Sequence, residues 1–213
     1  MQSILSKALL LSFCSLASGQ KISRTDSTWI ISKQFDDRRN DWKVNNRQSP
    51  FKLYSETESN GVVIQNSFPK GGGYTDRSAQ DTGYRVFWTR IINETTTPLE
   101  LTINFPADSF AVSPGAYIKL LLPPDTMTLD KEVLYSYGLE NVQSFLDSNL
   151  HKPTMLKRSV KPGEACIFYV IALLYQAAGV ARAELVSQEQ ALLYRINLLD
   201  PVLIPCGKIV IKN

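Results

Sequence analysis

Turn-forming residues divide the chain from Phe51 onward into short segments that are either apolar throughout or alternate between apolar and polar side chains. In Pro98–Phe105 every second residue is apolar, which is the pattern of a half-buried strand. Asn60-Gly61 joins two extended runs, and Asn-Gly is the strongest short signal for a hairpin. Lys161–Glu164 carries Pro and Gly where a type II turn requires them, and the fully apolar Ala165–Tyr175 follows as a central strand. This succession of turns and short strand-like segments predicts an all-β protein.

We expect an antiparallel β-sandwich of about nine or ten strands with one short helix. Helical spacing of apolar residues places the helix at Leu139–Asn149. The triple glycine in Pro69–Gly73 predicts a mobile loop, and Glu132–Tyr137 is a candidate strand. The other strands are predicted at Phe51–Thr57, Gly61–Ser67, Tyr84–Asn93, Pro98–Phe105, Ala116–Leu122, Thr154–Val160, Ala165–Tyr175, Ala181–Ser187, Ala191–Asn197 and Lys208–Lys212. With Pro-Gly-Glu before a central strand, the outline resembles immunoglobulin-like sandwiches, a resemblance that implies an architecture and no function.

The first residues have the three-part layout of a secretory signal. Lys7 supplies the positive charge, Ala8–Leu16 is almost wholly apolar, and Ala17-Ser18-Gly19 places small residues where a signal peptidase reads them. We therefore interpret residues 1–19 as a signal peptide that is cleaved after Gly19 or Gln20, and expect a periplasmic or extracellular protein. The apolar run is too short for a membrane anchor. Lipid attachment at Cys14 is the alternative, although that processing requires a small residue where Phe13 stands.

Residues 20–50 form a polar lead-in before the sandwich domain of residues 51–213. One strand is expected near Thr28–Ser32, followed by an irregular loop. The lead-in is either a solvated tail or an arm that binds a partner.

Cleavage of the signal leaves two cysteines, Cys166 and Cys206. Two thiols in one exported domain can form a disulfide. The bridge would close a loop of about 40 residues and stabilise the fold by roughly 3–4 kcal/mol. The alternative is two separate buried thiols that pack as small apolar side chains.

No motif indicates catalysis, a metal or a cofactor. The chain lacks a nucleophile elbow, a zinc-protease motif, a phosphate-binding loop and a dinucleotide fingerprint. Its only histidine, His151, lies in a polar connection, which indicates a surface residue. Asp76 and Asp81 flank a loop without matching any calcium-site spacing. Charges of both signs alternate without a basic cluster, so we expect no nucleic-acid binding.

Aromatic residues are the best candidates for recognition, because they bury much area at low entropic cost. Tyr74, beside the triple glycine, is expected to be exposed, and Trp42 and Tyr84 complete the candidate ligand-binding set, while Trp88 is assigned to the core. Asn93-Glu94-Thr95 is also a glycosylation sequon, in a predicted hairpin loop.

Three functions remain open. The first is an exported, non-catalytic module that binds an envelope protein or a polysaccharide. The second is a structural or assembly component of the cell envelope that acts by strand addition at an open sheet edge. The third is a hydrolase of extracellular polymers that uses paired carboxylates.

Overall fold

The computed structural model describes residues 20–25, 28–33, 53–176, 182–197 and 201–212. The chain divides into two compact units, residues 1–41 and 42–213. In the first unit, β1 (Gln20–Thr25) pairs with β2 (Thr28–Lys33) as an antiparallel hairpin. The strand expected near Thr28–Ser32 is therefore present, with a partner that was not predicted. The proposed signal segment and Trp42 lie outside the described residues.

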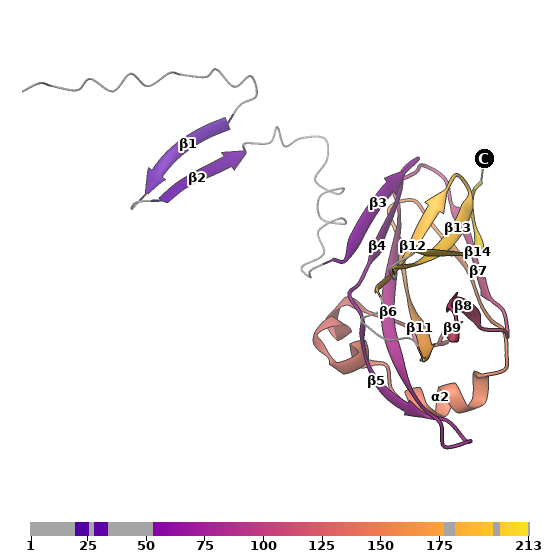
Figure 1. Cartoon of the computed structure of the whole chain (residues 1–213). Helices are drawn as coiled ribbons and strands as arrows, with labels where there is room; N and C mark the ends of the chain where they lie inside the picture. The colour runs from indigo at the N-terminus through magenta and orange to yellow at the C-terminus, as the bar shows by residue number, and fades with distance from the viewer. Residues whose placement is uncertain (1–19, 26–27, 34–52, 177–181, 198–200, 213) are drawn as a thin grey trace, which may run out of the picture. The chain divides into compact units, whose positions relative to one another are not determined.

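The second unit is built from two antiparallel sheets, which confirms the predicted all-β sandwich (Figure 1). One sheet has the order β3-β4-β6-β11-β9-β8, with β5 also paired to β6, and the other has the order β10-β7-β14-β13-β12. The strands are β3 (Ser55–Ser59), β4 (Val62–Asn66), β5 (Lys70–Thr75), β6 (Asp81–Asn93), β7 (Leu99–Phe105), β8 (Phe110–Ser113), β9 (Ala116–Leu121), β10 (Thr154–Val160), β11 (Ala165–Tyr175), β12 (Arg182–Gln188), β13 (Ala191–Asn197) and β14 (Val202–Ile211).

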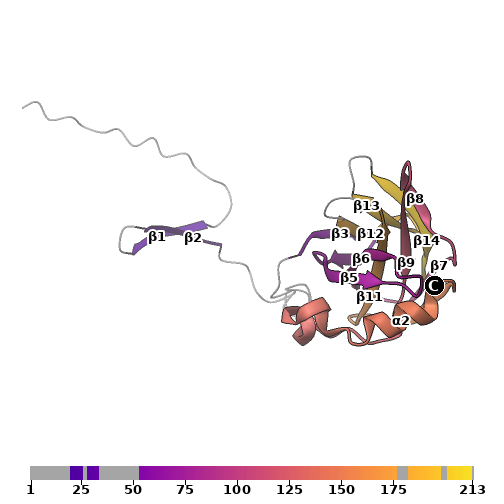
Figure 2. The ribbon, with the colours of Figure 1, turned by 60° about the horizontal axis from the view of Figure 1, so that its bottom comes forward.

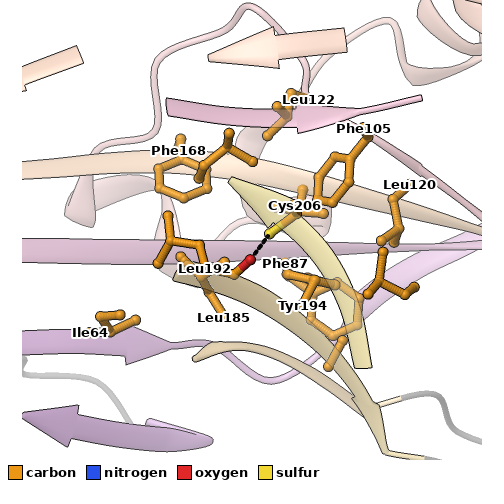
Figure 3. Close-up of a cluster of buried hydrophobic side chains, with 14 of the residues drawn as sticks. Ile64, Phe87, Phe105, Leu120, Leu122, Phe168, Leu185, Leu192, Tyr194 and Cys206 are labelled. Atoms are coloured by element: carbon orange, nitrogen blue, oxygen red, sulfur yellow. Dashed lines mark hydrogen bonds between the residues drawn. The ribbon is translucent and has the colours of Figure 1, made fainter. Parts of the chain in front are cut away.

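Two apolar clusters lie on the two faces of the seven-stranded sheet. The first fills the space between the sheets and contains Phe87, Phe105 and Tyr194 (Figure 3). The second contains Trp88 and Tyr169 and is covered by η1 (Leu129–Val133), η2 (Tyr135–Gly138) and α2 (Val142–Asn149) (Figure 2). Because both of its faces are covered, the central strand β11 is apolar throughout, as its sequence indicates.

Two local predictions are wrong. The triple glycine is not a loop but part of β5, which pairs with β6. A Cβ on Gly71 would lie 2.1 Å from the Tyr84 carbonyl oxygen, so glycine permits a close approach of the two strands there. Glu132–Tyr137 is not a strand but falls in η1 and η2. Ser136 and Tyr137 have positive φ angles of 45° and 55°, a left-handed conformation that cannot continue a strand.

A single amide closes the flank where β12 meets β4, which we call the sealed flank. Asn66, at the end of β4, donates from Nδ2 to the Leu185 carbonyl over 3.1 Å, and its Oδ1 accepts from the Leu185 N–H over 2.9 Å. The side chain thus satisfies the outer N–H and C=O of Leu185 in β12 as a neighbouring strand would. Thr89 also donates to Asn66 Oδ1, and Asn66 is only 1% exposed.

A buried carboxylate reinforces the sealed flank. Glu184 is 3% exposed and accepts hydrogen bonds from Arg195 Nε over 2.7 Å and from Asn197 Nδ2 over 2.9 Å. Burial alone would raise the pKa of Glu184, but hydrogen bonds from Ser55, Asn197 and Arg195 hold it below its usual value. The carboxylate is therefore ionised and fully partnered at neutral pH.

Candidate functional site

The opposite flank of the sandwich is left open by a pair of prolines. β9 pairs with β11 from Tyr117–Tyr175 to Leu121–Ile171. Continued for two more residues, the same register would set Pro123 opposite Tyr169. Proline has no N–H to donate, so the ladder ends at this point. No described strand pairs with this side of Ala165–Val170.

The open edge of β11 presents backbone groups of alternate residues. The Asn93 N–H donates to the Glu164 carbonyl over 3.0 Å. In the part of β11 that follows, the even-numbered residues therefore point their backbone N–H and C=O groups toward β6. Successive residues of an antiparallel strand alternate in direction. The N–H and C=O of Ala165 and Ile167 therefore point away from β6, and no described residue pairs with them there. Ala165 is exposed and Ile167 is half-buried.

Two cavities of about 240 and 460 Å³ run along this edge. They share Thr126, Arg158, Cys166 and Ile167, so together they form one depression, which we call the seam groove. Its walls are β10 of the other sheet, the edge of β11, and the segment that follows β9. The walls are largely apolar, and the remaining lining residues include Leu122, Pro123, Pro124, Asp125, Met127, Met155, Leu156, Glu164 and Phe168.

Hydrogen bonds fix both ends of the seam groove. At one end the Leu122 N–H donates to Thr154 Oγ1 over 2.9 Å, which joins the end of β9 to the start of β10. At the other end Asn93 Nδ2 donates to the Val160 carbonyl over 2.8 Å and to the Thr97 carbonyl over 2.9 Å. The groove is therefore a bounded site between two anchored strands. Asn93 is 0% exposed, so the amide of the sequon is engaged inside the fold.

Cys166 lines the seam groove, and no disulfide joins it to Cys206. Cys206 lies in the core between the sheets, where its thiol donates to the Leu192 carbonyl over 3.4 Å (Figure 3). Burial raises the pKa of Cys206 to about 12. Burial also raises the pKa of Cys166, against a small opposing effect of Arg158. The structure therefore corresponds to the alternative of two separate thiols, only one of which is half-exposed.

The tyrosines predicted to bind a ligand are not at the surface. Tyr74 is 3% exposed, and its hydroxyl donates to Asp147 on α2 over 2.9 Å. Tyr84 is also buried, in the cluster beneath the helical segments. The expectation that Tyr74 is exposed is therefore wrong, because the glycines beside it form a paired strand instead of a loop. Trp88 is fully buried, as predicted.

The polar residues considered for catalysis do not converge. Hydrolysis by paired acids needs two carboxylates that face each other. In the seam groove Asp125 lines one of the two cavities and Glu164 lines the other, and the two remaining cavities are lined by one carboxylate or none. Among the described residues no cluster of His, Cys, Asp or Glu could hold a metal ion. Asp76 instead accepts hydrogen bonds from the backbone N–H groups of Ser78 and Gln80 and so stabilises a turn.

Sequence reasoning did not find the residues of the seam groove. Met155, Leu156 and Phe168 look like ordinary strand residues, and nothing in their spacing indicates that the two sheets separate beside them. The available signal was Pro123-Pro124, which predicts where β9 stops but not which neighbour loses its partner.

No protein-family model matches the chain, and neither a curated protein nor a solved structure shows significant similarity to it. Within the described residues, no helix is both long and apolar enough to cross a membrane.

Proposed function

We propose that the protein is an exported, non-catalytic module that binds an extended segment of a partner polypeptide in the cell envelope. The segment would add to β11 as a strand in the seam groove. The observation that carries this proposal is the open edge at Ala165 and Ile167 beside an apolar groove. Backbone hydrogen bonds give such complexes their affinity, and pockets for alternate side chains give them specificity.

The dimensions and side chains of the seam groove indicate the length, side-chain pattern and charge of the segment that it would bind. The open edge spans Ala165–Val170, and a strand rises about 3.3 Å per residue, so roughly six residues of the partner would pair. Alternate side chains would face Leu156 and Phe168, which calls for apolar residues at every second position. The rim carries Arg158, Asp125 and Glu164, so it favours neither strongly acidic nor strongly basic segments.

The proposal is tested with a library of synthetic eight-residue peptides in which apolar residues alternate with Ser, Thr or Lys. Binding to the chain that begins at Lys21 is measured by fluorescence polarisation. Ala165→Pro removes an N–H that faces the groove without breaking a bond to β6, and the proline ring blocks the approach of a strand. Peptides that bind the wild type should bind Ala165→Pro at least about tenfold more weakly.

Ala165→Val is the matched control, because it changes the side chain and keeps the N–H; its affinity should stay within about threefold of the wild type. The proposal fails if no peptide of the library binds, or if the proline variant binds as tightly as the valine variant. Export is tested separately by the intact mass of the protein from its native source, which should lack residues 1–19 or 1–20.

A further inference from the structure

A second cleft, which shares no lining residue with the seam groove, is built around two tyrosines. Tyr117 of β9 and Tyr175 of β11 are direct cross-strand partners, so their rings project from the same face of the sheet. Tyr117 is 45% exposed, the most exposed tyrosine after Tyr135 in the described chain, and Tyr175 is half-buried. Together they form the wall of a cleft of about 540 Å³, which we call the tyrosine cleft.

The other lining residues of the tyrosine cleft are neutral. They are Gln80, Ser109, Gly115 and Gln176, so two amides and a hydroxyl surround the aromatic wall, and none of the described lining residues is charged. Each amide offers both donors and acceptors. A ligand that matches this set needs an apolar face for the rings and neutral hydroxyl groups around its edge. A sugar ring has this combination, whereas an anion would find no cationic side chain among the described lining residues.

The amides are held in place by the backbone. Gln176 has a φ of 53°, a left-handed conformation that non-glycine residues adopt at a cost, and such strain is common at ligand sites. Its Oε1 lies near Gly115, 3.8 Å from the position that a Cβ there would occupy, and Gly115 itself has a left-handed φ of 78°. Gln80 is positioned by the turn in which its N–H donates to Asp76 Oδ1 over 2.9 Å.

We infer that the tyrosine cleft binds a neutral sugar ring, stacked on Tyr117 and Tyr175 and hydrogen-bonded by Gln80 and Gln176. The volume lies within the range of small-ligand sites. Burial and the neighbouring Asp76 raise the pKa of Tyr175, so its hydroxyl stays protonated and can donate to the ligand. This inference is independent of peptide binding, because the tyrosine cleft and the seam groove share no lining residue.

The inference is tested by screening the chain that begins at Lys21 on an array of neutral and acidic oligosaccharides, followed by calorimetry with the neutral glycans that bind. Tyr117→Ala should weaken binding at least about tenfold through the loss of stacking, whereas Tyr117→Phe should stay within about threefold. Gln176→Ala should weaken binding about fivefold. Circular dichroism of each variant confirms that the sheet is intact.

The matched control is Tyr135→Ala, which removes another exposed tyrosine (71% exposed) outside the cleft and should leave affinity unchanged. The inference is overturned if no neutral glycan binds, if only acidic glycans bind, or if Tyr117→Ala binds a neutral glycan as tightly as Tyr135→Ala does.

Discussion

The two flanks of the sandwich differ in whether the outer backbone groups of their strands have hydrogen-bond partners. On the sealed flank, the outer backbone groups of β12 at Leu185 are satisfied by the amide of Asn66, and Glu184 is locked by Arg195 and Asn197. On the open flank, the outer backbone groups of β11 at Ala165 and Ile167 have no partner among the described residues. The comparison teaches that one side-chain amide can satisfy outward-facing backbone groups of an edge strand, and that an edge without such a side chain remains available for a partner.

The largest expected difference between the flanks is in the packing of matched leucines. Leu185 on the sealed flank is 1% exposed, whereas Leu156 on the open flank is half-buried at the groove wall. Leu185→Ala should lower the free energy of unfolding by about 4 kcal/mol and Leu156→Ala by about 1–2 kcal/mol. Urea denaturation of both variants measures the difference. Equal losses would mean that the open flank is packed as tightly as the sealed one.

The next largest effect on stability is expected from removing the side-chain amide of Asn66 on the sealed flank. Asn66→Ala leaves the Leu185 N–H and C=O buried without a partner and should cost about 3 kcal/mol. Asn104→Ala, which removes an exposed amide from β7, is the control and should change stability by less than about 0.5 kcal/mol. Denaturation midpoints that coincide for the two variants would contradict the sealing role of Asn66.

A smaller effect should appear in the pH dependence of stability. The pKa of Glu184 is lower in the folded than in the unfolded state, so its contribution is present above the unfolded pKa of about 4.5 and is lost as pH falls through the folded pKa. Glu184→Gln should therefore cost roughly 1 kcal/mol at pH 7 and progressively less below pH 4.5. Thermal denaturation between pH 3 and pH 7 gives the two curves. If the stability of the two proteins changed with pH in the same way, the ionised carboxylate of Glu184 would make no contribution to stability.

The smallest expected effect concerns the cysteines. Because Cys166 and Cys206 are free, reductant should not shift the melting temperature of the chain that begins at Lys21. One thiol, Cys166, should react with a maleimide in the folded state, and Cys206 should react only after unfolding. A drop of several degrees with reductant would instead reveal a bridge that contributes roughly 3–4 kcal/mol.

The sequence predicts strands well where apolar and polar residues alternate or where turn residues bound a segment. The short spacing of these strands along the chain predicts the sandwich. The sequence misleads at the triple glycine, because glycine suits both a loop and a close approach of strands such as β5 and β6. The exposure of Tyr74 depends on that choice, so the prediction that Tyr74 is exposed was wrong for the same reason. The seam groove and the pairing of Tyr117 with Tyr175 depend on which strands are neighbours across the fold, and local patterns do not encode that order.

Amide hydrogen exchange along β11, followed by NMR, tests the open edge most directly. In the free protein the amides of Ala165 and Ile167, which face the groove, should exchange at least about a hundredfold faster than those of Cys166 and Phe168, which bond to β6. A bound peptide should slow Ala165 and Ile167 selectively. Uniform protection across residues 165–168 in the free protein would show that this edge is already covered and would contradict the proposed strand addition.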